Sequence, residues 1–339
     1  MRRIVLAVLL GSLAACSGGG SPQEGGSGAA LLINGAGATF PNPLYSKWFS
    51  DYGRLHPEVR IDYQSIGSGG GIRQLINRTV FFGATDAPMT AEQGAEAKGA
   101  VLHVPTALGA VVPVYRLEGV QGPLNFPGPV LAGIVLGTIT HWNDPALAAA
   151  NPGVALPALD ITFVHRSDGS GTSFIFCDYL AKVSPEFASK VGVATSVAWP
   201  AGVGAKGNEG VAGLVRQTPG ALGYVELIYA IQNKIDYGAV GNVRASLASV
   251  TAAAAAASVP DDFRVSLVNA PAADAYPIAS FTWILLREDS GDGPRSKAMV
   301  EFLRWALTEG QATAENLGYA RVPPAVAEKA IAALSRVRT

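Results

Sequence analysis

Three times along the 339-residue chain, a short apolar segment leads into a Gly/Ser/Thr-rich turn and then into a segment with helical spacing. The turns lie at residues 35–40, 67–71 and 166–172. Glycine lets the backbone aim its N–H groups at one point, and a helix start adds unpaired donors and a positive dipole end. A single turn of this kind is commonly only a tight connection. Three of them together predict a binding site for a small oxyanion rich in acceptor oxygens.

The wider chain alternates predicted strands with predicted helices. Apolar and β-branched runs predict strands at 31–33, 59–65, 107–117, 160–164, 221–227 and 278–286. Helical spacing, including Leu44, Trp48, Tyr52 and Leu55 in a helix from near Pro41, predicts helices that extend over or begin at 41, 72, 173–182, 209–217, 294–307 and 324–337. This alternation is typical of α/β proteins whose sheets are covered by helices.

The first residues are typical of a bacterial export signal. Arg2 and Arg3 precede an apolar run over 4–10, and Leu13-Ala-Ala-Cys16 resembles a lipobox, at which Cys16 is acylated. We therefore expect a signal peptide at 1–15 and a lipidated Cys16 followed by a Gly/Ser-rich tether, together covering 16–30. The alternative is a buried N-terminal helix, which the glycine-rich stretch disfavours. Cys177 then remains as an unpaired cysteine, which we expect to be buried.

Composition excludes several classes of function. The 25 Lys+Arg and 26 Asp+Glu residues give a net charge of −1, which argues against binding to nucleic acid. The 49% apolar and 15% charged content argues against disorder, and the sequence has no apolar run of membrane-spanning length. The four histidines are scattered, and neither a P-loop nor a nucleophile-elbow motif occurs. We expect no metal and no cofactor.

Four segments carry a family resemblance: Gly35-Ala-Gly-Ala-Thr-Phe-Pro41, Ile66-Gly-Ser-Gly-Gly-Gly71, Phe82-Gly-Ala-Thr-Asp-Ala-Pro88 and Arg166-Ser-Asp-Gly-Ser-Gly-Thr-Ser-Phe174. They closely resemble the phosphate-binding protein of the bacterial ABC-type phosphate transporter. The resemblance extends from about residue 31 to the C-terminus, with supporting stretches that include Lys206-Gly-Asn-Glu-Gly210. Gly69, His165 and Phe81 depart from the residues common in that family. None of these departures removes a ligand that the resemblance implies.

The resemblance implies a role for each residue of the site. Thr39 and Phe40 donate backbone N–H groups, Ser68 donates through its hydroxyl and its amide, and Arg166, held by Asp168, pairs with the anion. Ser170, Gly171 and Thr172 donate from a helix start, and Asp86 accepts a hydrogen bond from a protonated phosphate oxygen. The ligand is inorganic phosphate, and Gly69 supports the site.

Asp86 is unexpected in an anion site, because a carboxylate repels phosphate. Its presence is reasonable if the ligand carries a proton, since the carboxylate then accepts a charge-assisted hydrogen bond. Sulfate carries no proton at neutral pH, so the same site rejects it, by a factor of roughly 10⁴–10⁵ in sites of this kind. Without the other motifs, Asp86 reads as a turn-stabilising residue and Arg166 as half of a surface ion pair.

The resemblance further implies the two-lobed periplasmic-binding-protein fold (type II), with a ligand cleft between lobes joined by two crossover strands. We expect lobe I at 31–112 plus 277–339 and lobe II at 113–276. We also expect a monomeric, non-catalytic periplasmic lipoprotein that closes around phosphate and delivers it to the permease subunits. Two alternatives stay open: a hydrolase that uses Ser68 or Ser170, and a binding protein for molybdate, sulfate or a phosphonate.

Overall fold

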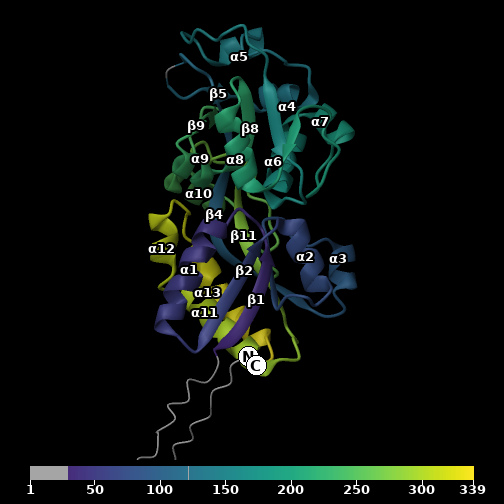
Figure 1. Ribbon diagram of the computed structural model, residues 1–339, viewed down its shortest axis with the longest axis vertical. Helices are drawn as coiled ribbons and strands as arrows, with labels where there is room; N and C mark the ends of the chain where they lie inside the picture. Colours follow the sequence, from purple (N-terminus) through teal and green to yellow (C-terminus); the bar gives the residue numbers. More distant parts are fainter. Residues whose placement is uncertain (1–29, 121) are drawn as a thin grey trace, which may run out of the picture.

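The computed structural model describes residues 30–120 and 122–339, which form two α/β lobes stacked along the long axis of the molecule (Figure 1). The N-terminal part of lobe I contains β1 (Leu31–Gly37), α1 (Asn42–Leu55), β2 (Val59–Ser65), α2 (Ser68–Ile76), β3 (Phe82–Thr85) and α3 (Ala91–Glu96). The chain returns to this lobe with α11 (Gly293–Leu307), α12 (Gln311–Asn316), α13 (Pro324–Ala333) and the 3-10 turn η1 (Leu334–Arg336). Residues 1–29, which include the predicted signal peptide, the predicted acylation site Cys16 and all but the last residue of the predicted tether, lie outside the described residues.

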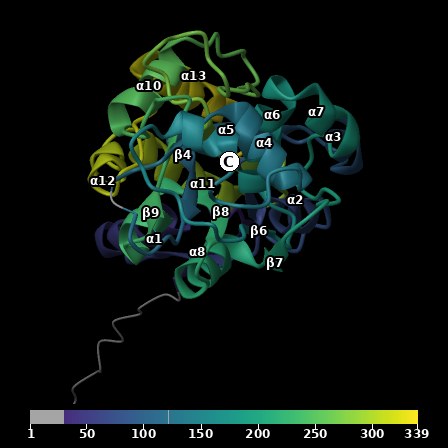
Figure 2. The ribbon, with the colours of Figure 1, turned by 90° about the horizontal axis from the view of Figure 1, so that it is seen from above.

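Lobe II is formed by the intervening chain. Its elements are β5 (Asn125–Phe126), α4 (Gly128–Leu136), α5 (Pro145–Ala150), β6 (Thr162–Arg166), α6 (Gly171–Val183), α7 (Pro185–Lys190), β7 (Val203–Ala205), α8 (Gly207–Gln217), β8 (Ala221–Glu226), α9 (Leu227–Asn233), β9 (Asp236–Tyr237), β10 (Ala239–Val240) and α10 (Leu247–Ala255). Seen from above, α8 lies on one side of β6 and β8, and α4 and α6 lie on the other (Figure 2). Cys177 in α6 is buried, as predicted, and burial raises the pKa of its thiol.

Two long strands, β4 (Val101–Tyr115) and β11 (Ala279–Arg287), join the lobes. The main sheet has the order β2-β1-β3-β11-β4-β8-β6-β7, with β9 also paired to β4. One part of β4 pairs antiparallel with β11 in lobe I, and its last five residues pair antiparallel with β8 in lobe II. A single strand therefore belongs to both lobes, which confirms the predicted crossover.

The start of β4 differs from the prediction, because the strand begins at Val101 and not at 107. The register with β11 shifts between Thr282 and Trp283, so that Thr282 faces Ala107 and Trp283 faces Pro105. A bulge of this kind accommodates a proline, which cannot donate to the ladder. The strand therefore continues through Pro105, where the sequence pattern is interrupted.

Helix α1 buries Leu44, Trp48 and Tyr52 as its spacing predicts, together with Tyr45, and Trp48 Nε1 donates to Gly310 O at 2.8 Å. Leu55, predicted to share this face, is 63% exposed, because it is the last residue of the helix. Within the described ranges, no helix combines the length and the apolar character needed to cross a bilayer.

Helices α2 and α6 begin earlier than predicted, at Ser68 and Gly171, so the glycine-rich turns form the first helical turns. Close packing explains the glycines. A Cβ on Gly71 would lie 2.4 Å from Gly37 Cα, and Gly67, which precedes α2, has a φ of 92°. The start of α2 therefore lies directly on the end of β1, and its first amides face the space between the lobes.

Candidate functional site

The three glycine-rich turns meet between the lobes. A Cβ on Gly171, at the start of α6, would lie 2.4 Å from Ser68 Oγ and 2.7 Å from Asp86 Cβ. Gly69, at the start of α2, donates its amide across the lobes to Gly169 O at 2.9 Å. Residues far apart in the sequence therefore share one small region, as the three-turn pattern predicts. We call this region the cradle, and it contains Thr39, Phe40, Ser68, Asp86, Arg166, Ser170, Gly171 and Thr172.

Backbone donors of the cradle are available. Within residues 30–120 and 122–339, the amides of Thr39 and Phe40 donate to no protein acceptor. The amides of Gly171 and Thr172 begin α6, where a helix offers no internal acceptor. Buried amides of this kind need a partner, and an anion with several oxygens supplies one.

Ser170 is engaged more fully than predicted. Its amide donates to Thr195 O at 2.7 Å, and its Oγ accepts from the Ser173 amide at 3.0 Å. Ser170 is thus the N-cap of α6, a role that serine commonly takes. Its own hydroxyl proton remains available for a further acceptor.

Arg166 and Asp168 form a bidentate ion pair, as predicted. Arg166 Nε donates to Asp168 Oδ1 at 2.7 Å and Nη2 donates to Oδ2 at 2.5 Å. The side chains are 1% and 12% exposed. Burial opposes ionisation of Asp168, but the guanidinium and the Gly207 amide outweigh it and hold the pKa of the carboxyl below its usual range. The pair fixes the guanidinium plane, and Nη1 lies 3.3 Å from Thr172 Oγ1.

Asp86 is a buried carboxyl group with two hydroxyl partners. It is 1% exposed, its Oδ1 accepts from Thr282 Oγ at 2.7 Å, and Ser68 Oγ lies 3.4 Å from its Oδ2. Burial raises the pKa of Asp86 to about 7, although Thr282, Arg166 and Ser68 all favour the charged form. A carboxyl group with this pKa exchanges a proton near neutral pH, and in its charged form it only accepts hydrogen bonds.

Asn208, which the sequence analysis did not assign, connects the two lobes. Its Nδ2 donates to Thr39 Oγ1 at 2.7 Å in lobe I and to Thr172 Oγ1 at 3.1 Å in lobe II, and its Oδ1 accepts from the Glu226 amide at 3.0 Å. Tyr229 adds a second link, because its hydroxyl donates to Thr39 O at 2.6 Å. Asn208 lies in one of the supporting stretches, but an asparagine at a helix start reads as a local cap.

Thr282 was missed for a similar reason. It lies in the middle of β11, whose nine residues are all buried. Nothing in a buried apolar strand indicates that one threonine contacts a carboxylate of another element. Ser280, two residues earlier, instead donates to its neighbour Phe281 O at 2.8 Å.

The departures from the family pattern leave the cradle contacts in place. His165 stacks on Trp199 with ring centroids 5.1 Å apart, and its Nδ1 lies 3.0 Å from Arg166 O. Phe81 donates its amide to Asn34 O at 2.8 Å. Neither contact involves a side chain of the cradle.

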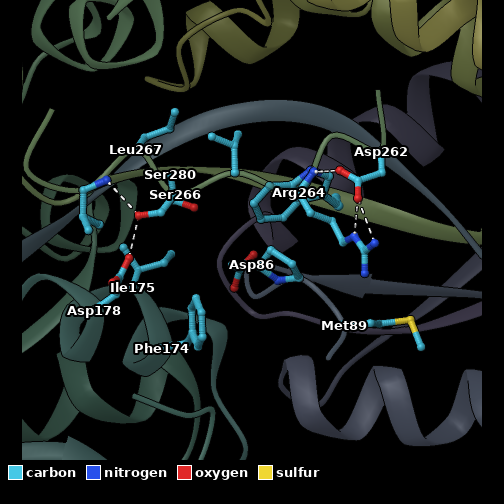
Figure 3. A pocket seen from close by; sticks show the side chains of 14 residues that line it. Asp86, Met89, Phe174, Ile175, Asp178, Asp262, Arg264, Ser266, Leu267 and Ser280 are labelled. Carbon is cyan, nitrogen blue, oxygen red and sulfur yellow. Dashed lines mark hydrogen bonds and ion pairs between the residues drawn. The ribbon is translucent and has the colours of Figure 1, made fainter. Parts of the chain in front are cut away.

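A cavity of about 390 Å³ lies between the lobes beside Asp86, and Figure 3 shows its lining. Asp86 lies near the middle of this view, with Phe174 of α6 and Met89 of lobe I around it. Asp178 at one side accepts from Ser266 Oγ at 2.5 Å. The carboxyl group of Asp86 therefore borders an interlobe cavity as well as the donors of the cradle.

The two serine hydroxyls of the cradle have few side-chain partners. Among the hydrogen bonds of the described residues, no histidine or lysine contacts Ser68 or Ser170, and the carboxyl group of Asp86, 3.4 Å from Ser68 Oγ, is the one titratable side chain that contacts either hydroxyl. The same residues contain no group of three or more His, Cys, Asp or Glu side chains with metal-binding geometry. Its amide and hydroxyl donors suit the cradle to hold an anion.

Comparison with known proteins places the chain in a family. A family model described as a PBP superfamily domain matches residues 20–309. The curated phosphate-binding protein PstS of Xylella fastidiosa strain 9a5c is 45% identical over 312 residues, which cover 90% of this chain and 85% of the relative. The chain belongs to the PstS family within the PBP superfamily. A further member, phosphate-binding protein PstS of Pasteurella multocida, is 43% identical over 88% of this chain and 89% of its own length.

Solved structures share the family fold. A phosphate binding protein from Stenotrophomonas maltophilia aligns with a TM-score of 0.73 at 19% identity, covering 89% of this chain and 94% of its own. A phosphate ABC transporter substrate-binding protein from Clostridium perfringens, solved with bound phosphate, aligns with a TM-score of 0.66 at 17% identity over 86% and 100%. These likenesses confirm the predicted two-lobed periplasmic-binding-protein fold.

Proposed function

We propose that this chain binds inorganic phosphate in the cradle and delivers it to the permease of an ABC-type phosphate importer. The observation that carries the proposal is the buried Asp86 carboxyl beside a guanidinium fixed by Asp168 and four helix-start or turn amides. Membership of a family whose curated relatives are named phosphate-binding proteins supports the same ligand.

Both lobes supply hydrogen-bond donors to the ligand. Thr39 and Phe40 give amides from lobe I, and Ser68 gives its amide and hydroxyl. Arg166 of lobe II supplies the compensating positive charge, while Ser170, Gly171 and Thr172 donate from the start of α6. A buried dianion needs this number of donors, because it has lost all of its hydration.

Asp86 gives the site its selectivity. As a carboxylate it accepts the proton that hydrogen phosphate carries, whereas sulfate places an oxygen lone pair against it. The mismatch leaves two acceptors in contact within a buried site, which is where an unpaired polar group is most costly.

Closure of the lobes gives the permease a ligand-bound conformation to recognise. Asn208 and Gly69 link the lobes directly, and a phosphate held by both lobes adds contacts that exist only in the closed arrangement. The ligand therefore shifts the population toward that arrangement. We assign lobe I to 31–112 plus 277–339 and lobe II to 113–276, with the change of lobe within β4 and just before β11.

We assign the chain as a periplasmic monomer, and the export signal and lipobox support its export and its attachment to a membrane through Cys16. Labelling of cells with radioactive palmitate tests the anchor. The intact chain is expected to incorporate label and Cys16→Ser to lose it, and equal labelling of the two contradicts the assignment.

Calorimetric titration with phosphate and sulfate side by side tests the ligand. We expect phosphate to bind at micromolar concentration or tighter and sulfate to be barely detectable. Equal affinities for the two anions overturn the role of Asp86. Tighter binding of molybdate or a phosphonate in the same titration would show that phosphate is not the ligand. Turnover of a chromogenic phosphate ester above a heat-inactivated control overturns the non-catalytic assignment and favours a hydrolase.

A further inference from the structure

A second cavity lies in lobe I, away from the cradle. Its volume is about 480 Å³, and it is lined where α2, α3, β11 and η1 end. Arg287 of its lining is five residues along β11 from Thr282, whose hydroxyl donates to Asp86 of the cradle. At about 3.3 Å per residue, this is roughly 16 Å along the strand. The cavity is therefore separate from the interlobe site.

Cations dominate the lining of this cavity. Five basic side chains face two acidic ones, and they are Arg78, Lys98, Arg287, Arg336 and Arg338 against Glu288 and Asp289. Two of the five are neutralised, because Arg336 pairs with Glu288 and Arg338 pairs with Asp289. Among the described residues, the other three have no carboxylate partner.

Arg287 is the buried member of the three cations that have no carboxylate partner. It is buried, and its guanidinium donates only to backbone carbonyls: Nη1 to Ala97 O at 2.7 Å, and Nη2 to Leu75 O at 2.7 Å and Ile76 O at 3.2 Å. These carbonyls end α2 and α3, so the side chain caps both helices. The partial charges of the helix ends offset the guanidinium only in part, and a positive wall remains.

Arg78 and Lys98 are the accessible members. Each follows a helix end, each is exposed, and each has a left-handed backbone, with φ values of 58° and 50°. Glycine or asparagine is favoured at such positions, and a bulky residue is disfavoured there. Two long cationic side chains therefore stand beside one cavity at positions where local backbone preference selects against them.

Both ends of the described chain lie at this end of lobe I (Figure 1). Arg295 Nε donates to Leu32 O at 2.8 Å beside the first strand, and a Cβ on Gly293 would lie 3.1 Å from the Thr339 carbonyl carbon. If Cys16 is acylated, as proposed above, the chain is attached to its membrane from this side.

We propose that this cavity is a second anion site, which takes a phosphate group on Arg78, Lys98 and the wall formed by Arg287. Two sources share this chemistry: free phosphate at concentrations above those that fill the cradle, and the headgroup of an anionic lipid next to the anchor. In the cradle, the ligand meets Asp86, whose partners are hydroxyl groups. In the second site, Glu288 and Asp289 are each paired with an arginine. The second site therefore does not select for a protonated anion.

The test uses the chain from Ser17 onward, which removes the predicted anchor. All helices and strands of the described residues follow residue 30, so the truncation removes none of them. Protein that already holds one equivalent of phosphate is titrated with inorganic phosphate, with phosphatidylcholine vesicles containing phosphatidylglycerol, and with pure phosphatidylcholine vesicles. We expect a second, weaker step with phosphate or with the anionic vesicles, and none with the neutral ones. Added salt should weaken this step.

The double variant Arg78→Glu/Lys98→Glu should weaken the second step at least tenfold and leave the tight step unchanged. Arg216→Glu/Lys234→Glu is the matched control, since both are exposed cations of lobe II without an ion pair in the described chain, and Lys234 also has a left-handed φ of 54°. Thermal melting verifies that both variants fold. A step with phosphate identifies a soluble anion, and a step with anionic vesicles alone identifies a lipid. No second step with either probe, or equal loss in both double variants, overturns the proposal.

Discussion

The two faces of the cradle carry opposite electrostatic character. The lobe I face presents hydroxyls and the Asp86 carboxyl, whose pKa burial raises to about 7. The lobe II face presents the Arg166 guanidinium, locked by Asp168, and the start of α6. Both faces carry amide donors, but only the lobe II face adds a cation and only the lobe I face adds a carboxyl group. Under the proposed function, the cation of lobe II therefore contributes mainly to affinity and the carboxyl group of lobe I contributes selection.

Replacing Asp86 should break this division most strongly. Asp86→Asn can donate to sulfate, so the phosphate-to-sulfate affinity ratio is expected to fall by a factor of about 10³ or more. Competitive calorimetry with the two anions measures the ratio. Thr282→Val is the companion variant, since it removes one hydrogen bond to Asp86 but keeps the carboxyl. It should preserve most of the selectivity, and an unchanged ratio in Asp86→Asn would disprove the assignment.

The raised pKa of Asp86 also predicts how stability depends on pH. The carboxyl group is protonated in both states below about pH 4, but above that the unfolded chain ionises while the folded one resists. The phosphate-free protein should therefore lose stability from about pH 4 to pH 7, by at most about 4 kcal/mol from this group.

Urea unfolding at pH 4.5, 6 and 8 measures this loss, and Asp86→Asn should flatten the curve. Glu226, which is buried and has a raised pKa, contributes in the same direction, so part of the slope remains. Asp62→Asn is the control, because that side chain is exposed beside Arg60. A slope that is the same in Asp86→Asn and in the unmodified protein contradicts the prediction.

The lobe II face is tested by Arg166→Ala. We expect both anions to bind about 10² to 10³ times more weakly, because the cation is lost and a buried, unpaired Asp168 then faces the ligand. The ratio between phosphate and sulfate should change little. Arg60→Ala is the control, because Arg60 pairs with Asp62 at the same two-residue spacing but on the surface. Loss of only one anion in Arg166→Ala would remove the distinction between the two faces.

The bridge between the faces should give the smallest effect. Asn208→Ala removes the hydrogen bonds to Thr39 and Thr172, and we expect about three- to tenfold weaker binding of phosphate with unchanged selectivity. Exposed Asn77→Ala should leave both quantities as they are. A large change in the phosphate-to-sulfate ratio would show that Asn208 contributes to selectivity, as Asp86 is expected to, and does not act only by linking the lobes.

Features of the site set by local sequence were predictable. Glycines that allow tight turns, a serine that caps a helix and an arginine two residues before an aspartate all act within a few positions. The cradle segments and the Arg166–Asp168 pair were therefore found from the sequence.

Features set by tertiary packing were not predictable. Asn208, Tyr229 and Thr282 enter the site through contacts with residues 169, 190 and 196 positions away, and no local pattern distinguishes them. The six extra residues of β4 depend on a bulge opposite β11, which becomes visible only when the two strands are paired. Local patterns identify the turns that donate to an anion, but not the side chains that bind those turns together.

The bulge between β4 and β11 has a consequence for protein engineering. Thr282, whose hydroxyl donates to the proposed selectivity residue Asp86, lies next to this bulge on β11, one of the two strands that join the lobes. Grafting the three glycine-rich turns onto another scaffold would omit β11 and its contact with Asp86. A biosensor or sequestering reagent made from this chain should therefore retain both long strands intact and place its reporter groups on the outer helices.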